Sequence, residues 1–131
     1  MAAEPRSGDE LARVLMRKAG GDEIVLVRLI EDDDVPDDVL GFHAQQAVEK
    51  MIKAVLASND ISYERTHNIT YLLTLLDSSK IPRPEQADRL PDLTPWAAGF
   101  RYSDLPEPTL NRGETLSLIE GTKICAAEQI G

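Results

Sequence analysis

The stretch that decides the fold is residues 42–56, which read FHAQQAVEKMIKAVL and contain no proline or glycine. Apolar side chains recur there at spacings of three and four, which places them on one face of a helix. Counted from just upstream, these positions are Leu40, Ala44, Val48, Met51 and Val55. Phe42, Ile52 and Leu56 widen the same face. We therefore expect a helix that the rest of the chain mostly encloses.

Polar residues interrupt this apolar helix, and each needs a partner. Glu49 and Lys53 lie four residues apart, in the order that favours a helical ion pair. Gln45 and Gln46 are consecutive, and a buried amide without a hydrogen bond costs about 1–3 kcal/mol. Either one glutamine is exposed while the other binds a neighbouring helix end, or one of them touches a ligand or a second subunit. His43 is expected to be a structural histidine with satisfied hydrogen bonds.

Size and composition indicate one helical domain. The chain has 131 residues, 42% of them apolar and 5% aromatic, which suits helices packed on helices around one core. We expect residues 1–8 to form a flexible tail and residues 9–131 to form a single domain. The formal net charge of −9 argues against a general nucleic-acid-binding surface, because phosphate contacts supply most non-specific affinity. One local basic groove remains compatible with that charge.

The sequence also bears on where the protein resides. Its one cysteine, Cys125, precludes an internal disulfide and favours a reducing compartment; we expect this side chain to be buried. No apolar run approaches the roughly 18 residues of a membrane span. The first eight residues lack the apolar core of a signal peptide. We therefore expect a soluble cytoplasmic protein.

Start and stop signals divide the chain into helices. The first is expected over residues 9–29, with a kink near Gly20 because Gly20 and Gly21 each cost about 1 kcal/mol in a helix. Its β-branched run at residues 24–30 would suit a strand, but no convincing strand partner occurs elsewhere. The other expected helices run from near Asp37 to Ser58, from Thr66 as N-cap to Leu76, over residues 85–90, from Thr94 as N-cap to Tyr102, and from Asn111 or Glu114 to Gln129.

Together these elements predict an all-α, up-and-down bundle of four to five helices with short connections. The acidic run at residues 31–38 separates the first two helices. It lacks the alternating ligands, mid-loop glycine and terminal glutamate of a calcium-binding EF-hand loop. We expect it to be a solvated turn that caps a helix, and we expect no metal and no cofactor.

Three blocks of the chain follow a known pattern in order. They are residues 42–50, Thr66-His67-Asn68 with the leucines that follow, and Arg101-Tyr102. They resemble the HEPN family (higher eukaryotes and prokaryotes nucleotide-binding domain), and the resemblance extends from about residue 9 to the end. It implies an all-α bundle that commonly dimerises. It also implies a frequent partner, a minimal nucleotidyltransferase, in toxin–antitoxin-like pairs.

Many members of that family are metal-independent ribonucleases. They carry an arginine, four to six intervening residues and then a histidine, with the site assembled across a dimer. The chain has two histidines, His43 and His67. The positions five to seven residues before them hold Pro36, Asp37, Asp38, Asp60, Ile61 and Ser62. None is arginine, so the ribonuclease motif is missing and the resemblance favours a non-catalytic member.

A nucleotide or phosphate site is expected in a groove between the second, third and fourth helices. Its candidate residues are Gln45, Gln46, Lys50, His67, Arg101 and Tyr102. His67 at a helix start would suit a phosphate or simple helix capping. Arg101 and Tyr102 would grip a phosphate and stack on a base, unless Arg101 instead pairs with Asp104 to hold the loop.

Three functions follow as hypotheses. The first is a non-catalytic HEPN module that binds a nucleotide or a protein partner and is regulatory in a nucleotidyltransferase pair. The second is a divergent ribonuclease that uses His67 and Arg101. The third is an assembly protein that only forms a homodimer or a complex with a neighbour-encoded enzyme.

Overall fold

The computed structural model describes residues 7–98 and 109–131. Four α-helices and one 3₁₀-helix form from these residues, and no strand occurs among them. The elements are α1 (Ser7–Leu29), α2 (Asp37–Ser58), α3 (Ile69–Ser78), η1 (Ala87–Ala98) and α4 (Arg112–Ile130). The predicted all-α fold is confirmed.

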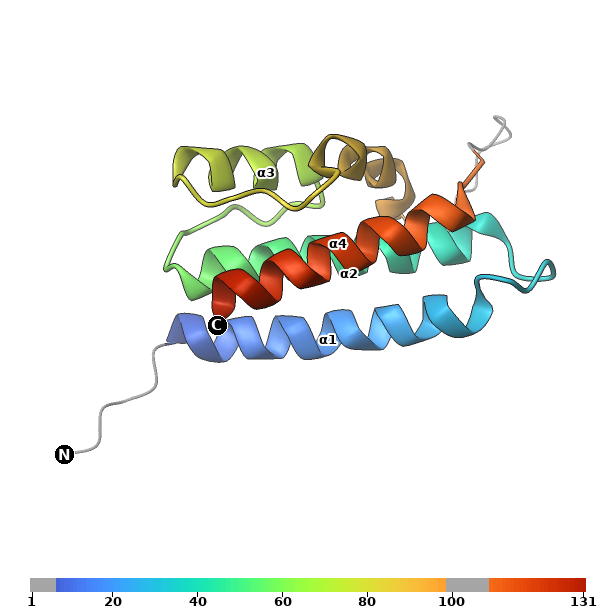
Figure 1. The fold of residues 1–131 in the computed structure, drawn as a ribbon, viewed down its shortest axis with the longest axis horizontal. Helices are drawn as coiled ribbons and strands as arrows, with labels where there is room; N and C mark the ends of the chain where they lie inside the picture. Colours follow the sequence, from blue (N-terminus) through green and yellow to red (C-terminus); the bar gives the residue numbers. More distant parts are fainter. Residues whose placement is uncertain (1–6, 99–108) are drawn as a thin grey trace.

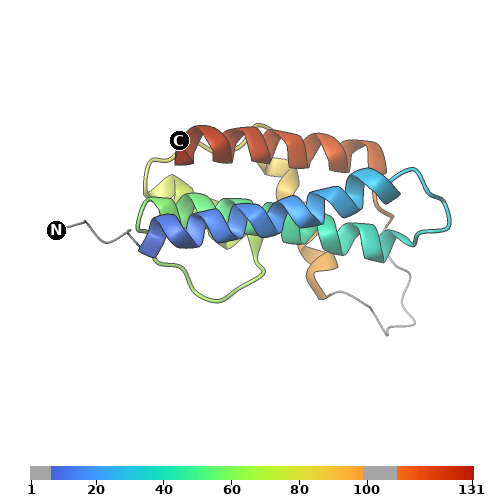
Figure 2. The same ribbon diagram turned by 90° about the horizontal axis from the view of Figure 1, so that it is seen from below.

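The predicted apolar helix, α2, lies at the centre of the bundle. It contacts α1, α3, η1 and α4, which surround it in the two views (Figures 1 and 2). The side chains predicted for its apolar face are buried from Leu40 to Leu56, except that Phe42 is only half-buried. No helix within the described ranges is long and apolar enough to cross a bilayer.

The connection between α2 and α3 is longer than predicted. α2 ends where Asp60 takes a φ of 56° and the Ile61 N–H donates to the Leu56 carbonyl at 2.9 Å, a common way to close a helix. Residues 59–68 then pass back beside α2, so that α3 runs in the same direction as α2 (Figure 1). The simple up-and-down arrangement is therefore wrong at this step, and the returning segment brings His67 beside the middle of α2.

The first helix is unbroken. α1 begins at Ser7, inside the predicted tail, and continues through Gly20 and Gly21 to Leu29. The β-branched run is helical, as predicted. A Cβ added at either glycine would meet nothing within 4 Å, so the packing of the described residues does not require glycine there.

Two helix starts differ from their predictions. The N-cap of α3 is Asn68, whose side chain accepts from the Tyr71 N–H at 3.1 Å. The predicted N-cap, Thr66, lies two residues earlier, and its hydroxyl accepts from the Asn68 N–H. In place of separate helices near residues 85 and 94, the chain forms η1, which contains Pro91 and Pro95. Proline cannot donate the hydrogen bond of an α-helix, and short 3₁₀ turns tolerate that loss better. The predicted continuation to Tyr102 lies outside the described residues.

The last helix begins close to its prediction. Asn111 is the N-cap of α4, and its side chain accepts from the Glu114 N–H at 3.0 Å. Cys125 is half-buried rather than fully buried, with its Sγ 3.6 Å from the Pro82 carbonyl oxygen. Burial raises the pKa of this thiol, with a smaller contribution from the charge of Glu128.

Arg112 holds the acidic turn between α1 and α2, a role that the sequence did not reveal. Its guanidinium donates to the Asp37 carboxylate at 3.0 Å. It also donates to backbone carbonyls of the turn, at 3.2 Å to Ile30, 3.0 Å to Asp32 and 2.6 Å to Val35. One planar group thus pins the acidic turn to the start of α4. The predicted helix capping by this turn is not observed, because the N-cap position of α2 is Pro36 and no side-chain cap hydrogen bond forms there.

Replacing Arg112 with lysine is expected to lower the free energy of unfolding by about 1–3 kcal/mol. Lysine keeps the charge but cannot reach several carbonyls at once, so partly buried acceptors lose their donors. Urea unfolding followed by circular dichroism measures the change. Arg89→Lys is the matched control, because that arginine pairs at an exposed site with Asp92 and Glu114 and its replacement should cost less than about 0.5 kcal/mol. Equal losses in both variants would contradict the role of Arg112.

Alanine substitution should have opposite effects at two helical glycines. Gly21→Ala is expected to raise the free energy of unfolding by about 0.5–1 kcal/mol, since the position is open and alanine favours a helix. Gly41→Ala is expected to lower it by about 1–3 kcal/mol, because the new Cβ would overlap the ring of Trp96. Thermal unfolding of both variants tests the packing of η1 on α2, which a stable Gly41→Ala protein would contradict.

Candidate functional site

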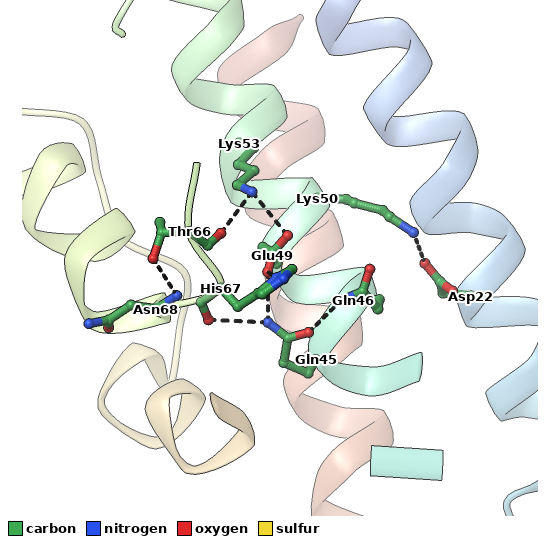
Figure 3. Close-up of polar contacts among 9 residues, drawn as sticks. All are labelled: Asp22, Gln45, Gln46, Glu49, Lys50, Lys53, Thr66, His67 and Asn68. Carbon is green, nitrogen blue, oxygen red and sulfur yellow. Dashed lines mark hydrogen bonds and ion pairs between the residues drawn. The ribbon is translucent and has the colours of Figure 1, made fainter. Parts of the chain in front are cut away.

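A network of polar side chains crosses α2 near its middle, and Glu49 is at its centre (Figure 3). The Glu49 side chain is only 6% exposed. Its carboxylate accepts from Gln45 at 2.8 Å, from Lys53 at 3.0 Å and from His67 at 2.7 Å. Gln45 and Lys53 lie one helical turn before and after Glu49, which explains why both reach it. His67 comes from the returning segment.

The protein keeps this buried carboxyl ionised. Burial alone raises the pKa of Glu49, but hydrogen bonds from Gln45, His67 and Lys53, together with the charge of Lys53, outweigh it. The pKa of Glu49 therefore lies below its usual range. Because an ionised carboxylate only accepts hydrogen bonds, the Nδ1 atom of His67 must carry the proton that lies between the two groups.

His67 is the exposed member of the network. Its side chain is 62% exposed, while its carbonyl accepts from the Gln45 amide at 3.3 Å. The Nε2 atom has no hydrogen-bond partner among the residues that the structure describes. A buried carboxylate thus orients an imidazole whose second nitrogen faces solvent, an arrangement suited to binding an anion or transferring a proton.

A second polar cluster joins α2 to α1. Asp22 of α1 accepts from Lys50 at 2.6 Å and from His43 Nδ1 at 2.9 Å. This contact satisfies His43, in keeping with the structural role predicted for it. Asp22 was not predicted as a site residue, since the residues next to it in the sequence do not indicate that it contacts α2.

The predicted site residues are only partly brought together. Gln45 is fully buried, and both N–H groups of its amide are used, while Gln46 donates to its oxygen at 2.8 Å. Gln45 is thus buried, as the first hypothesis for the glutamine pair required. Its amide hydrogen-bonds to the segment before α3 and to Glu49 of its own helix. Lys50 is held by Asp22, and His67 is exposed beside Glu49. Arg101 and Tyr102 lie outside the described residues.

Sequence reasoning missed the centre of this network. The Glu49–Lys53 ion pair was predicted from its spacing and is present, but nothing local indicated that His67 would complete the network.

The ligand groove was predicted between the second, third and fourth helices. A pocket of about 140 Å³ lies between η1 and α4, lined by residues that include Trp96 and Asn111, and none of the four predicted site residues that the structure describes (Gln45, Gln46, Lys50 and His67) lines it.

Glu49→Gln is expected to change both stability and its dependence on pH. At pH 7 the variant should lose about 1–3 kcal/mol of unfolding free energy, because charge-assisted hydrogen bonds are weakened at a buried site. A carboxyl with a lowered folded pKa stabilises the protein above its unfolded pKa of about 4.3, and this stabilisation disappears as the pH falls through the folded pKa. The difference between wild type and variant should therefore shrink below about pH 4.

Urea unfolding from pH 7 to pH 3 measures this difference. Asp77→Asn is the control, because a hydrogen bond from Arg83 also lowers the pKa of Asp77 but the pair lies at an exposed surface. That variant should lose much less. A Glu49→Gln deficit that stays constant down to pH 3 would contradict an ionised buried carboxylate.

Within the described ranges, no group of three or more His, Cys, Asp or Glu side chains is arranged to hold a metal ion.

Comparison with known proteins identifies the family of this chain. Neither the curated proteins nor the solved structures contain a match to the chain. The family model described as "HEPN domain" matches residues 12–124, which is most of the chain and includes α2 and the His67 segment. The chain therefore belongs to the HEPN domain family.

Proposed function

We propose that this HEPN protein is a non-catalytic binding module that holds a nucleotide, or a phosphate of a short RNA, at the surface around His67. One observation carries the proposal: an imidazole that is 62% exposed is fixed through Nδ1 by a carboxylate that is itself buried. A surface histidine without such support would sample several rotamers. A fixed ring costs less entropy when it binds a ligand.

The chemistry around His67 suits a phosphate. When the ring is protonated, its Nε2–H donates outward while Nδ1–H stays on Glu49. Arg65, two residues earlier, is exposed and forms no ion pair among the described residues, so it is available as a second cation. Arg101 and Tyr102 remain in the proposal from the sequence alone, as a phosphate grip and a stacking surface.

Gln45, Gln46 and Lys50 take supporting roles in this proposal. Gln45 is buried and fixes the segment that carries His67, and Gln46 in turn holds the Gln45 oxygen. Lys50 stays engaged with Asp22. We assign direct ligand contact to His67, with Arg65, Arg101 and Tyr102 around it.

The partners in this proposal come from family membership. They are a second copy of the chain and a minimal nucleotidyltransferase, in a toxin–antitoxin-like pair in which this chain is regulatory. The single cysteine supports the cytoplasm as the location. The missing arginine–histidine motif supports a non-catalytic role.

A divergent ribonuclease is the second candidate, and the Glu49–His67 contact favours it. A carboxylate that orients an imidazole is the arrangement used by acid–base catalysts. The net charge of −9 counts against a polyanionic substrate. Cleavage of a labelled RNA by wild type, lost in His67→Ala, would establish this candidate and overturn the non-catalytic one.

Thermal unfolding with ATP, GTP, their monophosphates and a short RNA tests the proposal. A ligand that binds only the folded protein at 100 times its Kd adds about 2.7 kcal/mol of stability, which is visible as a shift of several degrees. We expect such a shift in wild type and its loss in His67→Ala and Arg101→Ala. The RNA should remain intact.

Lys80→Ala is the matched control, since Lys80 is an exposed cation without an ion pair among the described residues. It should keep the full shift. If no ligand at millimolar concentration shifts wild type, nucleotide binding is wrong and assembly with a partner becomes the leading function.

A further inference from the structure

One face of α1 is turned to solvent and repeats at helical spacing. Counting along the helix, exposed residues recur every three or four positions, which aligns them in one stripe. They are Arg13, Arg17, Gly21, Ile24 and Arg28. We call this set the α1 stripe. At 1.5 Å per residue it is roughly 22 Å long.

The arginines of the α1 stripe make no side-chain contacts that would occupy their charge within the part of the fold that the structure describes. None of the three forms an ion pair or a side-chain hydrogen bond with another described residue. On the other elements, the described cations are paired except for Arg65 and Lys80. The paired ones are Lys50, Lys53, Arg83, Arg89, Arg112 and Lys123. In a chain of net charge −9, three unpaired arginines on one helix face form a local basic surface.

Between Arg17 and Arg28 the α1 stripe carries no charged side chain. Ile24 is 58% exposed, and Val27 beside it is 62% exposed. Gly21 leaves the helix backbone bare, and a Cβ there would meet nothing within 4 Å, so the fold itself has no steric need for glycine. An apolar centre with arginines around it has the composition of a protein interface, where arginine is enriched and apolar side chains are fully covered.

We infer that the α1 stripe docks a different protein chain, through an element that sets carboxylates around an aliphatic centre. The carboxylates would pair with Arg13, Arg17 and Arg28, and the aliphatic side chains would cover Ile24 and approach the backbone at Gly21. This surface is separate from the His67 site. The inference rests on the proposed function only in requiring a protein partner, and it assigns that partner a surface and a chemistry.

Charge disfavours a second copy in this position. The α1 stripe contains no carboxylate between its first and last arginine. In the antiparallel register that superposes the stripe on itself, Arg13 would face Arg28 of the second copy. In a parallel pairing, each arginine would face its own equivalent. Like charges in direct opposition disfavour both arrangements, which favours a different chain over a second copy on this surface.

Nucleic acid fits the stripe less well than an acidic protein. RNA supplies the negative charge, but two exposed aliphatic side chains occupy the middle of the surface. The stripe holds no aromatic side chain on which a base would stack. The role of Ile24 therefore separates the two kinds of partner in an experiment.

Selection of phage-displayed helical peptides against the folded chain at about 150 mM salt tests the inference. We expect enriched peptides that carry Asp or Glu around an aliphatic stripe, and their affinity should fall at least about tenfold with Arg17→Glu or Ile24→Asp. Gly21→Gln should also weaken binding while it raises the thermal unfolding midpoint, a combination that misfolding cannot produce. Lys80→Glu makes the same charge change on another face and should leave affinity unchanged.

Any one of four results would overturn the inference. In the first, the selection would yield no acidic, aliphatic peptides. In the second, the selected peptides would bind Arg17→Glu and Ile24→Asp as tightly as wild type. In the third, a short RNA would bind, and its affinity would fall with Arg17→Glu but not with Ile24→Asp, which would identify a nucleic-acid surface. In the fourth, light scattering would find a wild-type dimer that Arg17→Glu dissociates, which would place a second copy on the stripe. Loss of nucleotide binding in His67→Ala bears on none of these, so the two proposals fail separately.

Discussion

The buried carboxylate of Glu49 is the constraint on which the rest of the site depends. A charge at a side chain that is 6% exposed is tolerated only when donors surround it. Its own helix supplies Gln45 and Lys53, and the third donor is His67 from the segment that returns beside α2. The requirement to satisfy one charge therefore holds that segment in place, and it also fixes the ring that faces solvent.

Family membership and fold leave the function of a HEPN protein open, because function resides in sites on a fold. Two features of this chain stand apart from its structural framework. Half of the described lysines and arginines form ion pairs, and some of these pairs join helices, as Lys50 joins α2 to α1 and Lys123 joins α4 to α1. The exposed imidazole of His67 and the unpaired arginines of α1 remain available for contacts outside the chain.

The parts of the fold that were predicted correctly are those with a local signal. The spacing of Leu40, Ala44 and Val48 indicated α2 and its buried face, and each is fully buried. Asn111 was predicted near the start of α4 and caps it. The direction of α3 was predicted wrongly, because it depends on the path of residues 59–68, and no pattern within that segment shows that it returns along α2.

The sequence by itself determined the all-α class, the central helix and the family. All of these depend on residue spacings along the chain. Only the tertiary structure decided which polar groups meet. Arg112 binds a carbonyl 82 residues away in the sequence, and His67 reaches Glu49 across 18 residues. A buried polar group must find a partner, but the sequence does not say which one, because that choice is made when helices pack and close off water.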